Sequence, residues 1–402
     1  MKDKLFSELS DKISTKKCKL GLVGSGYVGY TLGLAAAKNG FETIGFDLSK
    51  EKVDNLNELG QPNLRGTYEI GDLHECDFIS ICVPTPIDKD HNPDLHPVIE
   101  AAKSLIDIVR PGQLFTLEST VAPGTTREVV LPELEKSGLS AERDFFVGYS
   151  PHRIDFGNPD YTIGTIPKVV AGIDEPSQKL LSAFLGSFVQ TLVPVSTLET
   201  AEMTKILENT FRLVNINLIN EIAEYCTKRD INLNEVVDAA ATKPFGFLAH
   251  YPSAGISGHC IPVDPYYLLE DAQKKGVELT LVKDSFKFHE KHIDHVVEKA
   301  LECGKRFLIV GVAIKPGSDD TRESVAGIIW DKLTDKGCEV IYHDPYIPSF
   351  HDTNSSPLDP KGVDGIILVT YHDDIDYERL LQSKTPIVDP RGILKGESVI
   401  HI

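Results

Sequence analysis

The chain has 402 residues, 41% of them hydrophobic, so it is long enough for two or three domains with cores of their own. Its formal net charge of -19 argues against non-specific attraction to nucleic acid or to an anionic membrane. The seven cysteines are scattered and form no Cys-x-x-Cys pair, which indicates reduced thiols in a cytoplasmic protein and predicts no metal site.

The first half of the chain is predicted to be a lead-in helix followed by a dinucleotide-binding domain. Apolar residues recur at helical spacing within residues 1–18, which are otherwise polar and unlike a signal peptide. From residue 19 to 199 strands alternate with helices, which predicts a parallel, doubly wound Rossmann sheet. No run of ~18 apolar residues predicts a membrane-spanning helix. The expected strands are residues 19–23, 41–46, 76–83, 113–117, 145–149 and 169–172.

Residues 200–302 are predicted to be a central helical region that joins domains or subunits. Apolar residues three or four apart make residues 200–228 one long amphipathic helix, and residues 234–241 and 281–301 add further helix. Residues 243–265 between them are rich in glycine and proline, so we expect a loop held in a defined shape. Long loops of this kind are usually functional.

Residues 303–402 return to the α/β pattern. A strand at 307–310 ends at Gly311, a helix follows at 324–336, and a second strand at 339–342 ends at Asp344. Later strands are expected at 366–370 and 386–388. This order repeats the beginning of the chain and predicts a second, Rossmann-like domain without the full glycine signature. The predicted fold class is therefore α/β throughout, with the helical region in the middle.

The motif Gly24-Ser25-Gly26-Tyr27-Val28-Gly29 follows a predicted strand and opens a helix. Its glycines permit a tight turn, close approach to a pyrophosphate and close helix packing, and the helix N-terminus offers N–H groups to phosphate. Asp47 ends the next strand, where a carboxylate bonds a ribose hydroxyl and favours NAD over NADP, although Lys50 and Lys52 are near. A merely structural glycine turn does not explain this order of elements.

The glycine- and proline-rich loop carries the candidate nucleophile, Cys260, between Gly258 and Asp264. A loop cysteine near cationic groups can act as a nucleophile, although a single cysteine is more often inert and Asp264 could simply form a turn. On the long helix, Lys205, Asn209 and Arg212 share one face. These three side chains either form a solvated polar surface or stabilise an oxyanion in the reaction.

Two further segments follow predicted strands, residues 83–86 and residues 118–126. Ligands of open α/β sheets bind outside the carboxyl ends of the strands, so we expect both segments at the same edge. Taken singly, each segment could be an ordinary turn.

Taken together, these motifs resemble the UDP-glucose/GDP-mannose dehydrogenase family, and most closely its UDP-N-acetylhexosamine 6-dehydrogenase branch. Six motifs occur in the family's order over residues 19–395: residues 24–29, 83–86, 118–125, 201–209, 258–265 and 315–324. The resemblance implies a cytoplasmic, NAD-dependent enzyme built as a homodimer or larger homo-oligomer on the long helix. It implies a Rossmann NAD-binding domain and a C-terminal domain that binds the nucleotide of a UDP-sugar, with no nucleic-acid or membrane partner.

The implied reaction is a four-electron oxidation of the sugar C6 hydroxyl to a carboxylate through a thiohemiacetal and a thioester on Cys260. The residues implied in catalysis are Cys260, Lys205, Asn209, Asp264, Thr120 and His152. The residues implied in cofactor binding are Gly24, Gly26, Tyr27, Val28, Gly29, Asp47, Pro84, Thr85, Ser119, Thr120 and Arg322. The residues implied in substrate binding are Arg153, Ile154, Lys205, Asn209, Arg212, Tyr251, Gly255, Gly258 and Lys315.

One departure from the family concerns the position after Ser150-Pro151, where the family usually carries a glutamate and this chain has His152. A histidine could still act as a base, or it could slow the last step so that the acyl-enzyme accumulates. The sequence Arg153-Ile154-Asp155 resembles the N-acetylhexosamine branch more than the UDP-glucose branch, which implies an N-acetylated sugar. The alternatives are a UDP-glucose 6-dehydrogenase, a two-electron hydroxyacid dehydrogenase, and a nucleotide-sugar binding protein that has lost turnover.

Overall fold

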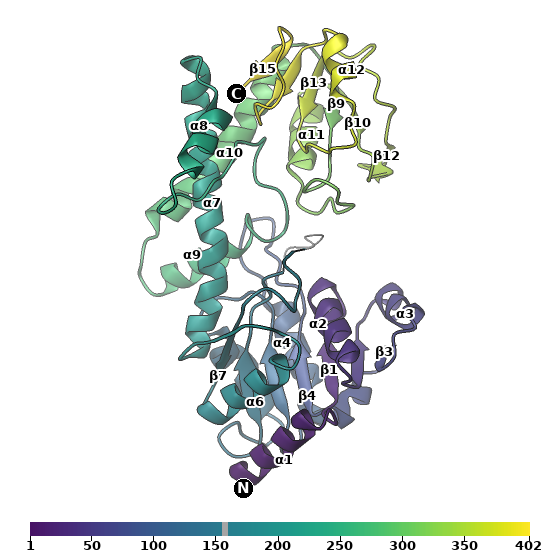
Figure 1. Cartoon of the computed structure of the whole chain (residues 1–402), viewed down its shortest axis with the longest axis vertical. Helices are drawn as coiled ribbons and strands as arrows, with labels where there is room; N and C mark the ends of the chain where they lie inside the picture. The colour runs from purple at the N-terminus through teal and green to yellow at the C-terminus, as the bar shows by residue number, and fades with distance from the viewer. Residues whose placement is uncertain (155–159) are drawn as a thin grey trace. The chain divides into compact units, whose positions relative to one another are not determined.

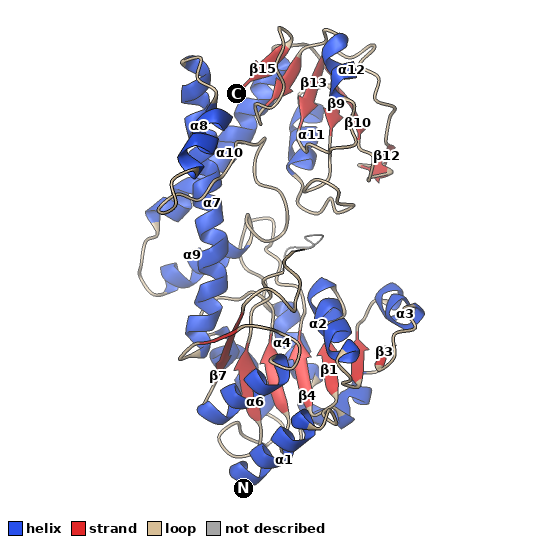
Figure 2. Ribbon diagram, viewed as in Figure 1, coloured by secondary structure: helices blue, strands red, loops and turns tan. Residues whose placement is uncertain are grey.

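A computed structural model describes residues 1–154 and 160–402 of the chain (Figure 1). The chain divides into two compact units, which are described separately here. The first contains Met1–Glu208 with Tyr266–Gly276, and the second contains Asn209–Pro265 with Val277–Ile402. Each unit has its own sheet covered by helices, as the colouring by secondary structure shows (Figure 2). The fold class is confirmed, whereas the predicted division into four parts at residues 18, 199 and 302 stays a prediction.

The first unit is built on an eight-stranded sheet in the order β3-β2-β1-β4-β5-β6-β7-β8. Buried apolar residues alternate between its two faces, so that one core lies on each face. Helices α1, α2 and α6 cover one face, and α4 and α5 cover the other. The strands are β1 Leu20–Val23, β2 Thr43–Phe46, β3 Leu64–Thr67, β4 Phe78–Ile81, β5 Leu114–Leu117, β6 Phe146–Tyr149, β7 Lys168–Gly172 and β8 Leu192–Pro194. The helices are α1 Lys2–Ser14, α2 Tyr27–Lys38, α3 Lys50–Glu58, α4 His96–Ser104, α5 Leu131–Glu135 and α6 Glu175–Leu185.

The expectation of an all-parallel sheet is wrong at one place, because β7 runs antiparallel to β6. Parallel neighbours need a crossover connection, usually a helix. The described part of the connection between β6 and β7, residues 150–154 and 160–167, contains no helix. The chain therefore turns back along β6, and the first residue of β7 lies near the carboxyl end of that strand.

The second unit contains a five-stranded parallel sheet in the order β10-β9-β13-β14-β15. Helices α10 and α11 pack on one face, and α12 packs on the other. A small antiparallel pair, β11 and β12, stands apart from this sheet. The strands are β9 Arg306–Val310, β10 Glu339–His343, β11 Ser349–Phe350, β12 Thr353–Asn354, β13 Gly365–Leu368, β14 Ile387–Asp389 and β15 Val399–His401. The helices are α8 Leu233–Ala241, α10 Thr280–Leu301, α11 Val325–Asp335 and α12 Tyr377–Gln382.

Two helices pass from one unit into the other along the chain. The long helix α7 spans Leu198–Lys228, as its amphipathic pattern predicts. Helix α9 spans Asp264–Lys274. The sequence suggested that Asp264 and Pro265 end the loop of residues 243–265, but in the structure they open this helix. Proline is favoured in the first turn of a helix, where its missing N–H has no partner to lose. Among the described residues, no helix is long and apolar enough to cross a membrane.

Candidate functional site

The glycine motif forms the tight turn between β1 and α2. Gly24 has a φ of +97°, and a side-chain carbon there would lie 2.8 Å from the Cys82 carbonyl oxygen. A side-chain carbon on Gly29 would lie 2.0 Å from the Gly24 carbonyl oxygen. Helix α2 begins at Tyr27 after Gly26, which supplies no capping side chain. The first N–H groups of the helix therefore face a turn with no Cβ in front of them, which suits a pyrophosphate.

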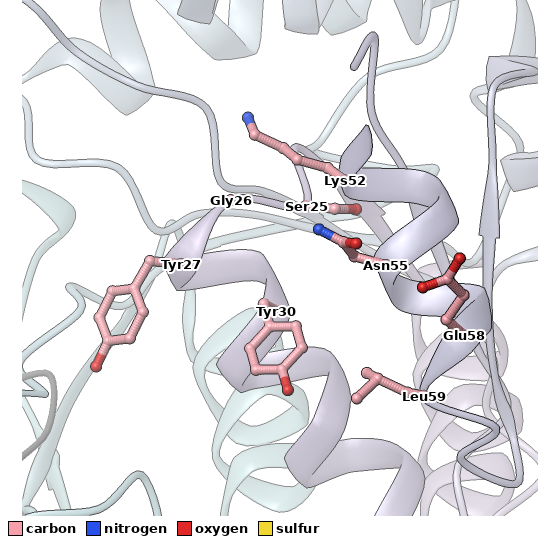
Figure 3. A pocket seen from close by; sticks show the side chains of 8 residues that line it. All are labelled: Ser25, Gly26, Tyr27, Tyr30, Lys52, Asn55, Glu58 and Leu59. Carbon is pink, nitrogen blue, oxygen red and sulfur yellow. The ribbon is translucent and has the colours of Figure 1, made fainter. Parts of the chain in front are cut away.

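Asp47 holds this turn from the end of β2. Its buried carboxylate accepts hydrogen bonds from the N–H groups of Ser25 and Ser49, both at 2.8 Å. The Lys52 ammonium lies 3.4 Å from the same carboxylate. A cavity of about 610 Å³ opens beside the turn, and Figure 3 shows the side chains around it. It is lined by Ser25, Gly26, Tyr27, Tyr30, Lys52, Asn55, Glu58 and Leu59. The residues present therefore fit a dinucleotide.

The segments that follow β4 and β5 meet at the same edge of the sheet, as the sequence predicts. The Ser119 hydroxyl donates a hydrogen bond of 2.6 Å to the Val83 carbonyl, directly before Pro84 and Thr85. The Tyr149 hydroxyl at the end of β6 donates to the Ser119 carbonyl at 3.1 Å. Thr120 and the 84–85 turn are thus fixed at the carboxyl ends of these strands, where α/β sheets bind ligands.

Glu202 is a structural anchor that the sequence reasoning did not single out. Its carboxylate is fully buried on α7 and accepts from the Gly124 N–H at 2.6 Å and from the Thr126 N–H at 2.8 Å. The Thr126 hydroxyl adds a third bond at 2.6 Å. These contacts tie the turn after Thr120 to α7, three residues before Lys205. Its place inside the 201–209 motif was the one feature of the sequence that could have drawn attention to Glu202.

His152 is enclosed beside the glycine turn. Its ring packs edge-on against Tyr27, with ring centroids 5.1 Å apart. Its Nε2 atom is shielded from solvent and has no hydrogen-bond partner among the described residues. Burial, and then the charges of Lys168 and Lys205, lower the pKa of His152 to about 3. The imidazole is therefore neutral at physiological pH and is a much weaker base than an ordinary histidine.

This buried imidazole makes a prediction for stability in acid. The folded pKa of about 3 lies below the ordinary value of 6.5, so between these pH values the unfolded chain binds a proton that the folded chain does not. Stability should therefore fall as the pH decreases through this window, by roughly 2 kcal/mol between pH 6.5 and pH 5. His152→Gln removes this contribution. Urea unfolding at the two pH values should show a smaller loss in this variant than in the wild type.

His96→Gln, at an exposed position on α4, is measured in parallel as the control for replacing a histidine by glutamine. An equal loss of stability in the wild type and in His152→Gln would show that His152 does not titrate in this way.

Arg153 is engaged within the first unit. Its guanidinium donates to the Pro167 carbonyl and forms an ion pair with Glu208 of α7, each at 2.6 Å. Ile154 follows it directly, and Asp155 lies outside the described residues. The guanidinium thus links the segment after β6 to the long helix at Glu208, three residues after Lys205.

In the second unit the structure brings Asn209 and Asp264 together with the Cys260 loop. The Asn209 side-chain amide donates to the Asp264 carboxylate at 2.5 Å, and both side chains are buried. The Asp264 N–H donates to the Cys260 carbonyl at 2.8 Å. The Cys260 thiol is partly exposed and lies 3.1 Å from His259 Nδ1. The nucleophile candidate thus sits one turn before a carboxylate that the long helix holds in place.

Arg322 lies on a segment that supports this loop. The Gly258 N–H donates to the Glu323 carbonyl at 2.9 Å, and the Val325 N–H donates to the Ser257 hydroxyl at 3.0 Å. The Arg322 guanidinium pairs with Asp320, and this bond, together with the nearby Cys260, raises the pKa of Arg322. A fixed cation therefore lies within electrostatic range of the Cys260 thiol.

The remaining substrate-binding candidates of the second unit lie on different elements. The Tyr251 hydroxyl bonds Asp238 of α8 at 2.7 Å. Gly255 is packed so closely that a side-chain carbon would meet Ile293 at 3.1 Å. Arg212 is exposed on α7, and Lys315 follows β9 at the carboxyl edge of the second sheet. These residues are placed on three separate elements.

The turn that carries Lys315 is built like the first glycine turn. Asp344, at the end of β10, accepts from the Val312 N–H at 2.7 Å and from the Ala313 N–H at 3.1 Å. His372 Nδ1 accepts from the Gly317 N–H at 3.2 Å, so Nε2 carries the proton and donates to Asp344 at 3.1 Å. Asp344 after β10 thus holds the turn after β9, just as Asp47 after β2 holds the turn after β1. The repeated sequence order predicts this correspondence.

Comparisons with known proteins agree over nearly the whole chain. Three models of the UDP-glucose/GDP-mannose dehydrogenase family match: the NAD binding domain over residues 58–188, the central domain over 199–290 and the UDP binding domain over 308–396. Protein CapL of Staphylococcus aureus is 33% identical over 94% of this chain and 97% of its own length. UDP-N-acetyl-D-glucosamine 6-dehydrogenase of Pseudomonas aeruginosa is 31% identical over 89% of this chain and 92% of its own.

A solved structure gives the same result. UDP-D-ManNAc dehydrogenase from Pyrococcus horikoshii has a TM-score of 0.87 to this chain, with 28% identity over 95% of this chain and 98% of its own. The family resemblance, the fold and the NAD cofactor expected from the sequence are thereby confirmed. The chain belongs to the UDP-glucose/GDP-mannose dehydrogenase family and has that family's NAD binding domain.

Proposed function

We propose that the protein oxidises the C6 hydroxyl of a UDP-sugar to a carboxylate, with NAD as oxidant and Cys260 as nucleophile. The observation that carries this proposal is the bonded set of Asn209, Asp264 and the Cys260 loop, with Arg322 in electrostatic range of the thiol. This set supplies a nucleophile, a carboxylate and a fixed cation without a metal. Among the described residues, no group of His, Cys, Asp or Glu side chains is arranged to hold a metal ion.

The cofactor would be held by the glycine turn, by Asp47 and by the 84–85 and 119–120 turns. When bound, NAD accepts two electrons as a hydride in each of two oxidation rounds. The chain's own residues perform the remaining work. In the first round the C6 hydroxyl gives its proton to water, the C6–H bond breaks with loss of a hydride to the oxidant, and the carbon becomes an aldehyde. The Lys205 ammonium stabilises the charge on the reacting oxygen. Thr120 orders water at the carboxyl edge of the sheet.

Cys260 carries the second half of the reaction. Its thiolate adds to the aldehyde carbon, and the oxygen takes a proton to give a thiohemiacetal. The C6–H bond of the thiohemiacetal then breaks with loss of a second hydride to the oxidant, its hydroxyl proton passes to water, and a thioester remains. Water then adds to the thioester carbon, the carbon–sulfur bond breaks, and the carboxylate leaves as the thiolate is restored. Asp264, held by the Asn209 amide, receives the proton of the attacking water.

The proposed substrate is a UDP-N-acetylhexosamine, of the glucosamine or mannosamine type. The names of the relatives from Pseudomonas aeruginosa and Pyrococcus horikoshii support this choice, and so does the resemblance of the sequence Arg153-Ile154-Asp155 to the N-acetylhexosamine branch. The match of the UDP binding domain model to residues 308–396 supports a nucleotide site near Lys315. We place the reaction in the cytoplasm because the seven cysteines are scattered and the described structure forms no disulfide.

We also propose that the protein forms a homodimer through the long helix. Helix α7 exposes large apolar side chains that recur every three, four or seven residues on its surface. They are Leu207 (56% exposed), Phe211 (46%), Leu218 (49%), Ile222 (39%) and Tyr225 (59%). An apolar stripe of this kind is typical of a protein–protein interface. Light scattering after size-exclusion chromatography would show a monomer if this proposal is wrong.

The amount of NADH formed per sugar consumed tests the proposed function directly. We expect two NADH for each UDP-N-acetylhexosamine, measured across UDP-GlcNAc, UDP-ManNAc, UDP-GalNAc and UDP-glucose. A preference for UDP-glucose would correct the sugar and keep the reaction. One NADH per sugar at steady state would indicate a two-electron dehydrogenase, and absence of NADH from every sugar would overturn the proposal.

A second candidate function is nucleotide-sugar binding with impaired turnover. The neutral state of His152, at the position of the family's usual glutamate, favours it, because a weak base assists thioester hydrolysis poorly. A burst of NADH that stops, with a mass increase on Cys260, would support this alternative.

A further inference from the structure

Lys168 lies at the carboxyl edge of the first sheet because β7 runs antiparallel to β6. It is the first residue of β7, which pairs antiparallel with β6. An antiparallel strand enters at the edge where its neighbour ends. The Lys168 side chain therefore lies at the carboxyl ends of β5 and β6, beside Glu118 and Ser150, and not at the opposite edge, where the first residues of β5 and β6 lie.

The Lys168 ammonium joins three segments at this edge. It pairs with the Glu118 carboxylate at 2.6 Å and donates to the carbonyls of Ser150 at 3.3 Å and Pro151 at 3.2 Å. The two charged side chains are 5% and 1% exposed. An ammonium has three donors, so these contacts use all of them. A buried ion pair contributes little net stability compared with apolar packing, so stability alone does not account for it.

The bonds to Pro151 and Glu118 lead to residues beside the glycine turn of residues 24–29, called the cofactor turn below. Pro151 is followed directly by His152, whose ring packs against Tyr27 at the start of α2. Glu118 is followed directly by Ser119, whose hydroxyl bonds the Val83 carbonyl before the 84–85 turn. Removing the ammonium would free two carbonyls and one carboxylate at once, and the neighbouring His152 and Ser119 would lose their fixed supports.

We propose that Lys168 is a positioning residue, which through Glu118, Ser150 and Pro151 holds His152 and the 119–120 turn against the cofactor turn. The assignment rests on the proposed function as far as turnover is concerned, but its effect on NAD binding does not depend on the sugar. Lys168 touches neither the sugar nor the thiol in this assignment. It acts through the residues that it holds.

The test uses a double variant, because Lys168→Met alone leaves the Glu118 carboxylate buried without its partner and can unfold the unit. Lys168→Met combined with Glu118→Gln removes both charges and keeps similar side-chain volumes. We expect the double variant to fold but to bind NAD about tenfold more weakly, since small displacements at such sites have large effects. The His152 ring resonances should shift, and the pKa of His152 should rise because a neighbouring cation is gone.

NAD affinity is measured by titration calorimetry, and His152 is followed by NMR of histidine-labelled protein. The matched control is the exposed pair on α6, Glu175→Gln with Lys179→Met, which should change neither quantity. If the double variant does not fold, Lys168→Arg, which keeps the charge and alters the donor geometry, gives the same two measurements.

Unchanged NAD affinity and unchanged His152 resonances in a folded variant would overturn the proposal. If the wild-type protein oxidises no sugar, the proposed function fails, whereas the NAD and NMR measurements still decide the role of Lys168.

Discussion

Cys260→Ser is expected to abolish the formation of two NADH per sugar, with a loss of steady-state rate of roughly 10³-fold or more. A serine hydroxyl is a far weaker nucleophile than a thiolate, and the thioester intermediate needs a sulfur atom at this position. The Cys260 loop is fixed by the bonds of Gly258 to Glu323 and of Asp264 to the Cys260 carbonyl. The exchange of one atom should therefore leave the loop in place, so that the loss reports chemistry and not folding.

The measurement has two parts. NADH is followed at steady state, and a carbonyl reagent traps any aldehyde released after the first oxidation. Cys303→Ser is the matched control, because this partly exposed thiol at the end of α10 bonds only the Lys299 carbonyl among the described contacts. If Cys260→Ser still formed two NADH per sugar at the wild-type rate, the thioester route would be excluded.

The parts of the fold that the sequence predicts are those with local causes. The glycine turn and the strand–helix alternation follow from residues close together in the chain, and so does the length of α7, which runs from Leu198 to Lys228 as one amphipathic pattern. The turn at Asp344 is predictable for the same reason, since the second sheet repeats the order of the first.

The parts that the sequence does not predict depend on contacts between distant residues. The direction of β7 is set by the connection after Ser150, which carries no periodic signal. The pairing of Glu118 with Lys168, 50 residues apart, follows only once that direction is known. Glu202 reaches back 78 residues to the Gly124 N–H. Local patterns locate such polar residues in motifs but do not say which backbone groups they bind.

His152 shows the same limit in its chemistry. Its position after Pro151 is visible in the sequence, and the departure from the family's glutamate is visible too. Its protonation state is not, because burial and the charges of Lys168 and Lys205 decide it together. A histidine that the sequence offers as a base near neutral pH is in the folded chain a neutral ring.

Lys205→Met is expected to lower kcat by roughly 10²- to 10³-fold while changing the affinity for NAD little. A preorganised cation beside a developing oxyanion contributes this much in enclosed sites, because the group needs no reorientation during the reaction. Lys205 stands one helical turn before Asn209 on α7, and the Glu202 bonds to the 124–126 turn fix that part of the helix. Methionine keeps the length and helix propensity of the side chain, so the charge is the main loss.

A second readout separates this electrostatic role from a structural one. The Lys205 charge is one of the two that lower the pKa of His152, so the pKa of His152 should rise in Lys205→Met. Lys228→Met, at the exposed end of the same helix, provides the control and should affect neither kcat nor His152. If kcat fell while His152 titrated as before, the Lys205 charge would not reach His152, and the loss of kcat would not be assigned to electrostatics beside that ring. If kcat held while the pKa of His152 rose, Lys205 would be a neighbour of the site without a part in the reaction.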